Sequence, residues 1–161
     1  MSLFNKKDKD KSIMLKYIDG IEVYTKDLII TATLKEDLLE IKGKHVSNIP
    51  IIKLPYEQIL AVNCVTEKEI LQSNKSVVGR AVVGGVLLGS LGAIIGGASG
   101  IGSKNKEEIN YFIVINYKTK SENLKIISSQ IVGFTNWNKF IRELKGKIKN
   151  QDIEDNIEIY L

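Results

Sequence analysis

Residue types that build common functional sites are scarce in this chain of 161 residues. Cys64 is the only cysteine and cannot form a disulfide within the chain, and His45 is the only histidine. A zinc site would need both residues together with carboxylates, so we expect no metal, a small buried thiol at Cys64 and a loop at His45. Arg80 and Arg142 are the only arginines. Specific nucleic-acid binding, which uses bidentate arginine contacts with phosphate, is therefore disfavoured.

Motifs for catalysis and cofactor binding are also missing. The spacing from Gly84 to Gly89 matches a phosphate loop, but Ser90 occupies the position that requires lysine. A dinucleotide fingerprint that begins at Gly100 fails because residue 105 is asparagine. The carboxylate pairs flank lysines or lie near the chain ends, which favours solvated charge over acid–base chemistry. We expect no catalytic residue, no cofactor and no enzymatic activity.

The N-terminal segment gives no sign of a secretory signal, because it is polar after Phe4. Residues 1–13 are rich in lysine and aspartate, which predicts a flexible tail. The net charge of +4 rests on lysine. The length suffices for one domain with an insertion. These features favour a protein on the cytoplasmic side of a membrane or in the cytoplasm.

The segment from Gly79 to Gly102 is the most unusual part of the chain. It holds nine of the thirteen glycines, and no charge occurs from Ala81 to Ser103. In water each glycine weakens a helix by about 1 kcal/mol, whereas in lipid a face of small residues lets helices pack closely. Small residues recur here every three or four positions, which places them on one helical face. This predicted packing face for a membrane or an oligomer consists of Ala81, Gly85, Gly89, Gly92, Gly96 and Gly100.

Short alternating runs on both sides of this segment predict antiparallel strands. Before it, the alternation is clear at residues 29–34, Pro50 and Pro55 bracket an edge strand, and Ile59 to Ile70 resembles one longer strand. After it, Ile109 to Tyr117 is rich in β-branched and aromatic residues, and a further strand signal follows at Leu124 to Ile127.

The pattern changes to a helical period from Thr135 onward. Apolar residues recur at the spacing of one helix face, with charged residues away from it. We expect an amphipathic helix that packs on the sheet and an acidic tail over residues 150–161. The predicted core positions of the helix are Trp137, Phe140, Ile141, Leu144 and Ile148.

This order of elements resembles the pleckstrin-homology-like (PH-like) fold, in particular small bacterial PH-like and GRAM-like domains. The similarity lies in TKDLIITATLKEDLLEIKG, IPIIKLPYEQILAV, NYFIVINY, LKIIS and the closing TNWNKFIRELKGKI, and it covers residues 14–149 with an interruption at 75–104. It implies a mainly β fold with α-helix: an antiparallel β-sandwich or partly open barrel closed by a C-terminal amphipathic helix, with an inserted glycine-rich helical hairpin. The interruption resembles bacterial glycine-zipper segments. The first hairpin lacks the basic cluster of many phosphoinositide-binding PH domains.

Three arrangements fit the glycine-rich segment. A helical hairpin with arms of about 18 Å would dip into one leaflet, since a bilayer core is about 30 Å thick. In that arrangement Arg80, Lys104 and Lys106 would extend to the headgroups. A straight helix over residues 78–103 would span the membrane but would separate the two strand regions. In the third arrangement, the hairpin is buried against the sheet or a partner subunit.

The sequence therefore predicts a non-enzymatic, membrane-associated PH-like adaptor. Its expected partners are membrane lipid, further copies of the chain and an unidentified protein. The alternative is a soluble homo-oligomeric scaffold or ligand-binding protein whose hairpin is buried at the subunit interface. Membrane permeabilisation by assembled zippers is a third interpretation, which rests on composition alone.

Overall fold

The computed structural model describes residues 11–73, 82–98, 109–133 and 136–155, with only the backbone at residues 98 and 149–155. These ranges contain nine strands, three α-helices and one 3-10 helix. In chain order they are β1 Ser12–Asp19, β2 Ile29–Leu34, β3 Leu38–Gly43, β4 Ile52–Pro55, η1 Tyr56–Gln58, β5 Ile59–Thr66, α2 Glu67–Ser73, β6 Val82–Val83, β7 Val86–Leu87, α3 Leu91–Ala98, β8 Tyr111–Lys118, β9 Leu124–Ile131 and α4 Trp137–Asp155.

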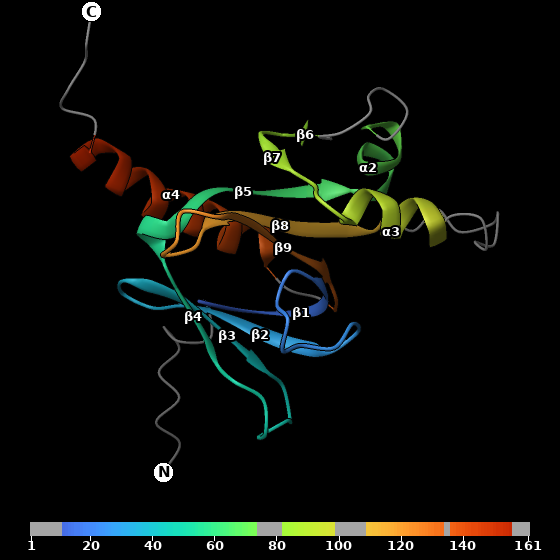
Figure 1. Ribbon diagram of the computed structural model, residues 1–161, viewed down its shortest axis with the longest axis horizontal. Coiled ribbons are helices and arrows are strands. Elements are labelled where there is room, and N and C mark those ends of the chain that lie inside the picture. The colour runs from blue at the N-terminus through green and yellow to red at the C-terminus, as the bar shows by residue number, and fades with distance from the viewer. Residues whose placement is uncertain (1–10, 74–81, 99–108, 134–135, 156–161) are drawn as a thin grey trace, which may run out of the picture.

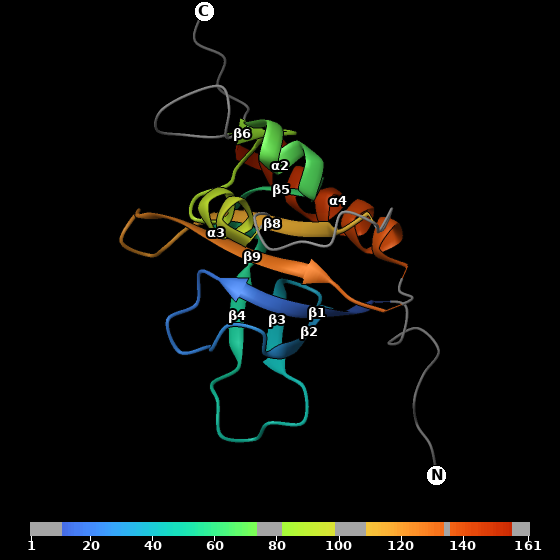
Figure 2. The same cartoon turned by 90° about the vertical axis from the view of Figure 1, so that its right-hand side faces the viewer.

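Seven strands form one antiparallel sheet in the order β4-β3-β2-β1-β9-β8-β5. Figure 1 shows β1 to β4 in one layer and β5, β8 and β9 in another, and Figure 2 shows β3 and β4 crossing the direction of β8 and β9. The expected edge strand between Pro50 and Pro55 is confirmed, because β4 lies at one end of the order. The mainly β class is also confirmed and agrees with a PH-like sandwich.

Both faces of β8 are buried, which divides the apolar interior into two clusters. Ile113 and Ile115 belong to the larger cluster, inside the curved sheet. Phe112 and Val114 belong to a second cluster. Successive side chains of a strand point to opposite faces, so these two clusters lie on opposite sides of β8. The second cluster requires something to cover the outer face of β5 and β8.

The C-terminal helix α4 covers the larger cluster. Phe140, Ile141, Leu144 and Ile148 are all buried in it, and Trp137 packs against it while half-buried. The Trp137 ring also lies 5.0 Å from the Tyr111 ring, measured between centroids. The helix continues to Asp155, past the expected domain end at residue 149, and β1 begins at Ser12 rather than Met14.

The expectation of one strand from Ile59 to Ile70 is wrong at its C-terminal end. The strand ends at Thr66, and α2 begins at Glu67. The Thr66 hydroxyl accepts a hydrogen bond from the Glu69 backbone N–H at 3.2 Å, and the Glu69 carboxylate accepts one from the Thr66 N–H at 2.7 Å. This reciprocal pair is a capping box, which satisfies two backbone donors and starts the helix.

Candidate interaction site on the glycine-rich insertion

The insertion leaves the sheet and returns to it at one place. Thr66 at the end of β5 pairs with Tyr111 at the start of β8. The residues that follow β5 and precede β8, Glu67 and Asn110, are also joined. The Glu67 N–H donates to the Asn110 carbonyl at 3.1 Å, and the Asn110 side chain donates to the Glu67 carboxylate at 2.8 Å. The two flanking strand regions therefore share one sheet. A helix that separates them, and so crosses a membrane once, is incompatible with this pairing.

The first described part of the insertion is a β-hairpin and not a helical arm. Val82–Val83 pairs with Val86–Leu87, and the two turn residues, Gly84 and Gly85, have φ angles of 56° and 82°. Positive φ at both central residues defines a two-residue turn of the type that matches strand twist, and glycine adopts it without steric cost. The expected helix is wrong here because paired glycines between valines favour a hairpin over a helix.

The insertion folds back onto the outer face of the sheet, as Figure 1 shows for β6, β7 and α3 beside β5 and β8. Val86, Leu88 and Leu91 are fully buried there. Burying three such side chains contributes roughly 5–9 kcal/mol before the entropy of ordering the segment is subtracted. The inner side of the described insertion is thus part of the domain interior. The residues of the sheet and α2 that it covers are Ile18, Val65, Ile70, Phe112 and Val114.

Polar side chains of the sheet hold the backbone of the insertion. Asn116 of β8 is 4% exposed; its carboxamide accepts a hydrogen bond from the Leu87 N–H at 2.7 Å and donates one to the Leu87 carbonyl at 2.9 Å. Asn63 of β5 donates to the Gly84 carbonyl at 2.7 Å. The Ser90 hydroxyl donates to the Asp19 carboxylate. Sequence reasoning missed Asn63 and Asn116, although a single asparagine inside an apolar strand is a recognisable signal.

The predicted packing face is only partly helical. Gly89 has a φ of 57° and precedes α3, so Gly85 and Gly89 lie on no helix. On α3, Gly92 is buried and Gly96 half-buried, whereas Ala93 and Gly97 are exposed. Among the described helices, none is long and apolar enough to cross a membrane. The remaining predicted residues lie outside the described ranges: Ala81, Gly100, Arg80, Lys104 and Lys106.

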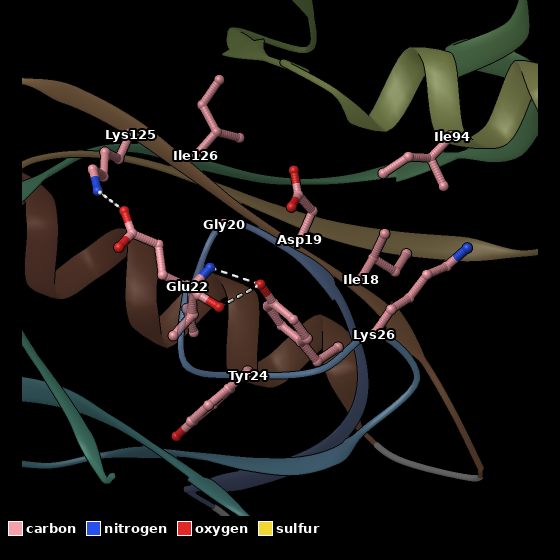
Figure 3. Close-up of a pocket in the computed structure, with 11 residues that line it drawn as sticks. Ile18, Asp19, Gly20, Glu22, Tyr24, Lys26, Ile94, Lys125 and Ile126 are labelled. Atoms are coloured by element: carbon pink, nitrogen blue, oxygen red, sulfur yellow. Dashed lines mark hydrogen bonds and ion pairs between the residues drawn. The ribbon is translucent and has the colours of Figure 1, made fainter. Parts of the chain in front are cut away.

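A cleft of about 530 Å³ lies where α3 faces the loop between β1 and β2. Ile94 of α3 forms part of its lining, together with residues of the loop and of β9. The charged residues around it are two acidic and two basic, and Figure 3 shows the Glu22 carboxylate paired with the Lys125 ammonium at 3.2 Å. This balance gives the cleft no excess charge for attracting an anion. The four charged lining residues are Asp19, Glu22, Lys26 and Lys125.

Cys64 and His45 lie in different parts of the fold. Cys64 on β5 is half-buried, and burial, with a smaller effect of Glu69 opposed by Lys145, raises the pKa of its thiol to about 11. His45 lies in the β3–β4 loop with a φ of 61°. Within the described ranges no group of three or more His, Cys, Asp or Glu side chains is placed to hold a metal ion.

A family model described as a glycine zipper containing PH domain matches residues 2–132 of the chain. The match includes every strand and the insertion, and it ends before α4. No curated protein matches the chain.

Proposed function

Because the chain belongs to the family of glycine zipper containing PH domains, we propose that it is a non-enzymatic module that binds a membrane surface from the cytoplasmic side through the outer side of its docked insertion. PH domains are interaction modules in general. The expected protein partner would then bind elsewhere on the domain. The apolar side chains on the inner side of the insertion are occupied by the sheet, so only the outer side is free to meet lipid.

The exposed, uncharged outer side of α3 carries this proposal. Ala93 and Gly97 are exposed and lie one turn apart, and Val82 of the preceding hairpin is 56% exposed. No charge occurs in the sequence from Ala81 to Ser103, whereas lysines follow at 104 and 106. A helix of eight residues is about 12 Å long, which suits contact with one leaflet. Lys104 and Lys106 would contact anionic headgroups, while Glu107 and Glu108 directly after them balance their charge.

Vesicle flotation of the full chain tests this contact. We expect the native protein to float with vesicles of phosphatidylcholine and phosphatidylserine. The double change Ala93→Asp and Gly97→Asp should weaken binding at least tenfold, because two charges would then meet the lipid. Neither change disturbs the fold, since both positions are exposed and a side chain at Gly97 would meet no neighbour.

The matched control places the same two charges on α4. Asn138 and Gly146 are exposed, and a side chain at Gly146 would also meet no neighbour. The Asn138→Asp and Gly146→Asp variant should float like the native protein. Equal flotation of both variants, or no flotation of the native chain, would refute the proposal. Deleting residues 75–104 is a poorer test, because it would uncover Phe112 and Val114.

The second candidate function is a self-associating scaffold, with which the docking of the insertion is compatible. Val86, Leu88 and Leu91 are buried in protein and are not presented to lipid. A scaffold would form a defined oligomer in the absence of vesicles. A membrane-binding module does not need to form an oligomer. Sedimentation velocity of the native chain in the absence of lipid separates the two functions.

A further inference from the structure

We propose that the outer face of α4 is a docking surface for an acidic segment of a partner protein, which crosses the helix at Gly146. The face is defined by Asn138, Arg142 and Gly146, which lie at i, i+4 and i+8 and are all exposed. The inference rests on the proposed function only for the expectation of a protein partner. It does not depend on the membrane contact, because α4 and the insertion cover clusters on opposite sides of β8.

Positive charge is concentrated on this helix. Between Trp137 and Ile148 the sequence has four basic residues and one acidic residue, Glu143. The first turn of α4 contains no acidic residue, although the N-terminal end of a helix favours one. A negatively charged partner would therefore complement the excess positive charge of the helix. The four basic residues are Lys139, Arg142, Lys145 and Lys147.

Two of the four cations are held in place by contacts within the domain. The Lys145 ammonium donates a hydrogen bond to the Asn63 carboxamide at 3.1 Å, and the Lys147 ammonium lies 5.2 Å from the centre of the Tyr56 ring. These contacts are with β5 and η1, so the two lysines flank the outer face on its two sides. An ammonium has three N–H donors, which leaves donors for a partner. Side chains that are already ordered lose less entropy when they bind.

Gly146 lies inside the helix, where glycine is less favourable than alanine. It is exposed, and an added Cβ would meet no heavy atom within 4 Å. Nothing in the described part of the domain therefore requires a glycine at this position. A glycine does allow another backbone to approach the helix closely, which a side chain on the outer face would prevent. The partner segment is accordingly expected to cross α4 at this residue.

The composition of the face favours a protein segment over a membrane or a nucleic acid. None of the exposed large apolar side chains among the described residues lies on α4, whereas a helix that lies on a membrane presents such side chains to lipid. Phe140 is buried and Trp137 packs on Tyr111, so the outer face offers no ring on which a base could stack. From Asn138 to Gly146 the face is about 12 Å long, which suits one short segment.

An NMR titration of the full-length chain with a synthetic polyglutamate peptide tests this surface. We expect chemical-shift changes at the amides of Asn138, Arg142 and Gly146 and none on α3. The Asn138→Asp and Gly146→Asp variant should bind the peptide at least tenfold more weakly than the native chain, because two carboxylates would then repel it. The matched control is Ala93→Asp with Gly97→Asp, which changes the net charge equally and should bind like the native chain.

The variant Gly146→Leu tests the close approach without a change of charge. It should bind the peptide at least threefold more weakly, although leucine favours a helix more than glycine does. Native affinity in this variant, or equal affinities in the two aspartate variants, would overturn the proposal. Tighter binding of an oligothymidine than of the peptide would also overturn it, because the face would then select a nucleic acid. No lipid is present, so failure here is distinguishable from failure of vesicle flotation.

Discussion

Replacing Asn116 by aspartate tests the strongest polar contact between the insertion and the sheet. The variant keeps the shape of the side chain. An ionised carboxylate still accepts a hydrogen bond from the Leu87 N–H, but it cannot donate to the Leu87 carbonyl. A buried carbonyl left without a partner costs about 1–3 kcal/mol, and burial of the new charge adds to this cost. We therefore expect Asn116→Asp to weaken docking of the insertion by at least about 1–3 kcal/mol at neutral pH.

The loss should be reversed by acid. A protonated carboxyl group both donates and accepts, as the native carboxamide does. Burial and the nearby Leu87 carbonyl both disfavour the ionised form, so the pKa of the introduced carboxyl group in the folded variant lies above its value in the unfolded chain. Between these two pKa values the folded state binds more protons, and stability falls as the pH rises. The variant should therefore approach native stability at low pH and lose it toward neutral pH.

Urea denaturation and exchange of the Leu87 amide, both measured across the pH range, provide the assay. Asn116→Ala is the control, because it removes both hydrogen bonds and has no group that titrates. We expect the free-energy difference between the two variants to grow as the pH falls. If Asn116→Asp follows Asn116→Ala at every pH, or matches the native chain at neutral pH, the two hydrogen bonds do not hold the insertion.

Two further predictions concern Gly89 in the insertion and Cys64 on the strand beneath it. Gly89→Ala should destabilise the protein by at least about 1–2 kcal/mol in urea denaturation, because residue 89 has a positive φ and its Cβ would press on Ile126, while Gly97→Ala should cost little. Alkylation of Cys64 at pH 8 should be about a hundredfold slower than that of an exposed thiol in the urea-unfolded chain, because burial raises its pKa from 9.0 to about 11. The same shift stabilises the fold below about pH 9 and is lost as the pH rises toward 11. A native stability for Gly89→Ala, or equal alkylation rates, would contradict the respective geometry.

Much of the sheet follows directly from local patterns in the sequence. The alternation at residues 29–34 predicts one buried face, and this alternation is the observed burial pattern of β2. Pro50 and Pro55 predict an edge strand because proline cannot extend a ladder, and β4 lies at an edge. The helical stripe that includes Phe140 and Leu144 predicts the buried face of α4. These features are local, since each depends on the period of one segment.

The insertion shows where the local pattern is insufficient. Small residues at every third or fourth position fit a helical face, yet the same glycines also fit turns with positive φ, as at Gly84 and Gly85. The period alone cannot choose between these conformations, because glycine tolerates both. The capping box at Thr66 and Glu69 was readable in the sequence and marks where β5 ends.

Composition and period are enough to establish that a charge-free, glycine-rich segment interrupts a series of antiparallel strands, whereas the PH-like fold is implied by the resemblance to a family. They also require that this segment return to where it left, once its two flanking regions belong to one sheet. The docking of the described part of the segment on the sheet, in contrast, is visible only in three dimensions. It depends on Val86 and Leu88 meeting an apolar surface and on Asn116 meeting the Leu87 backbone. These partners are far apart in the chain, so no local period encodes their contact.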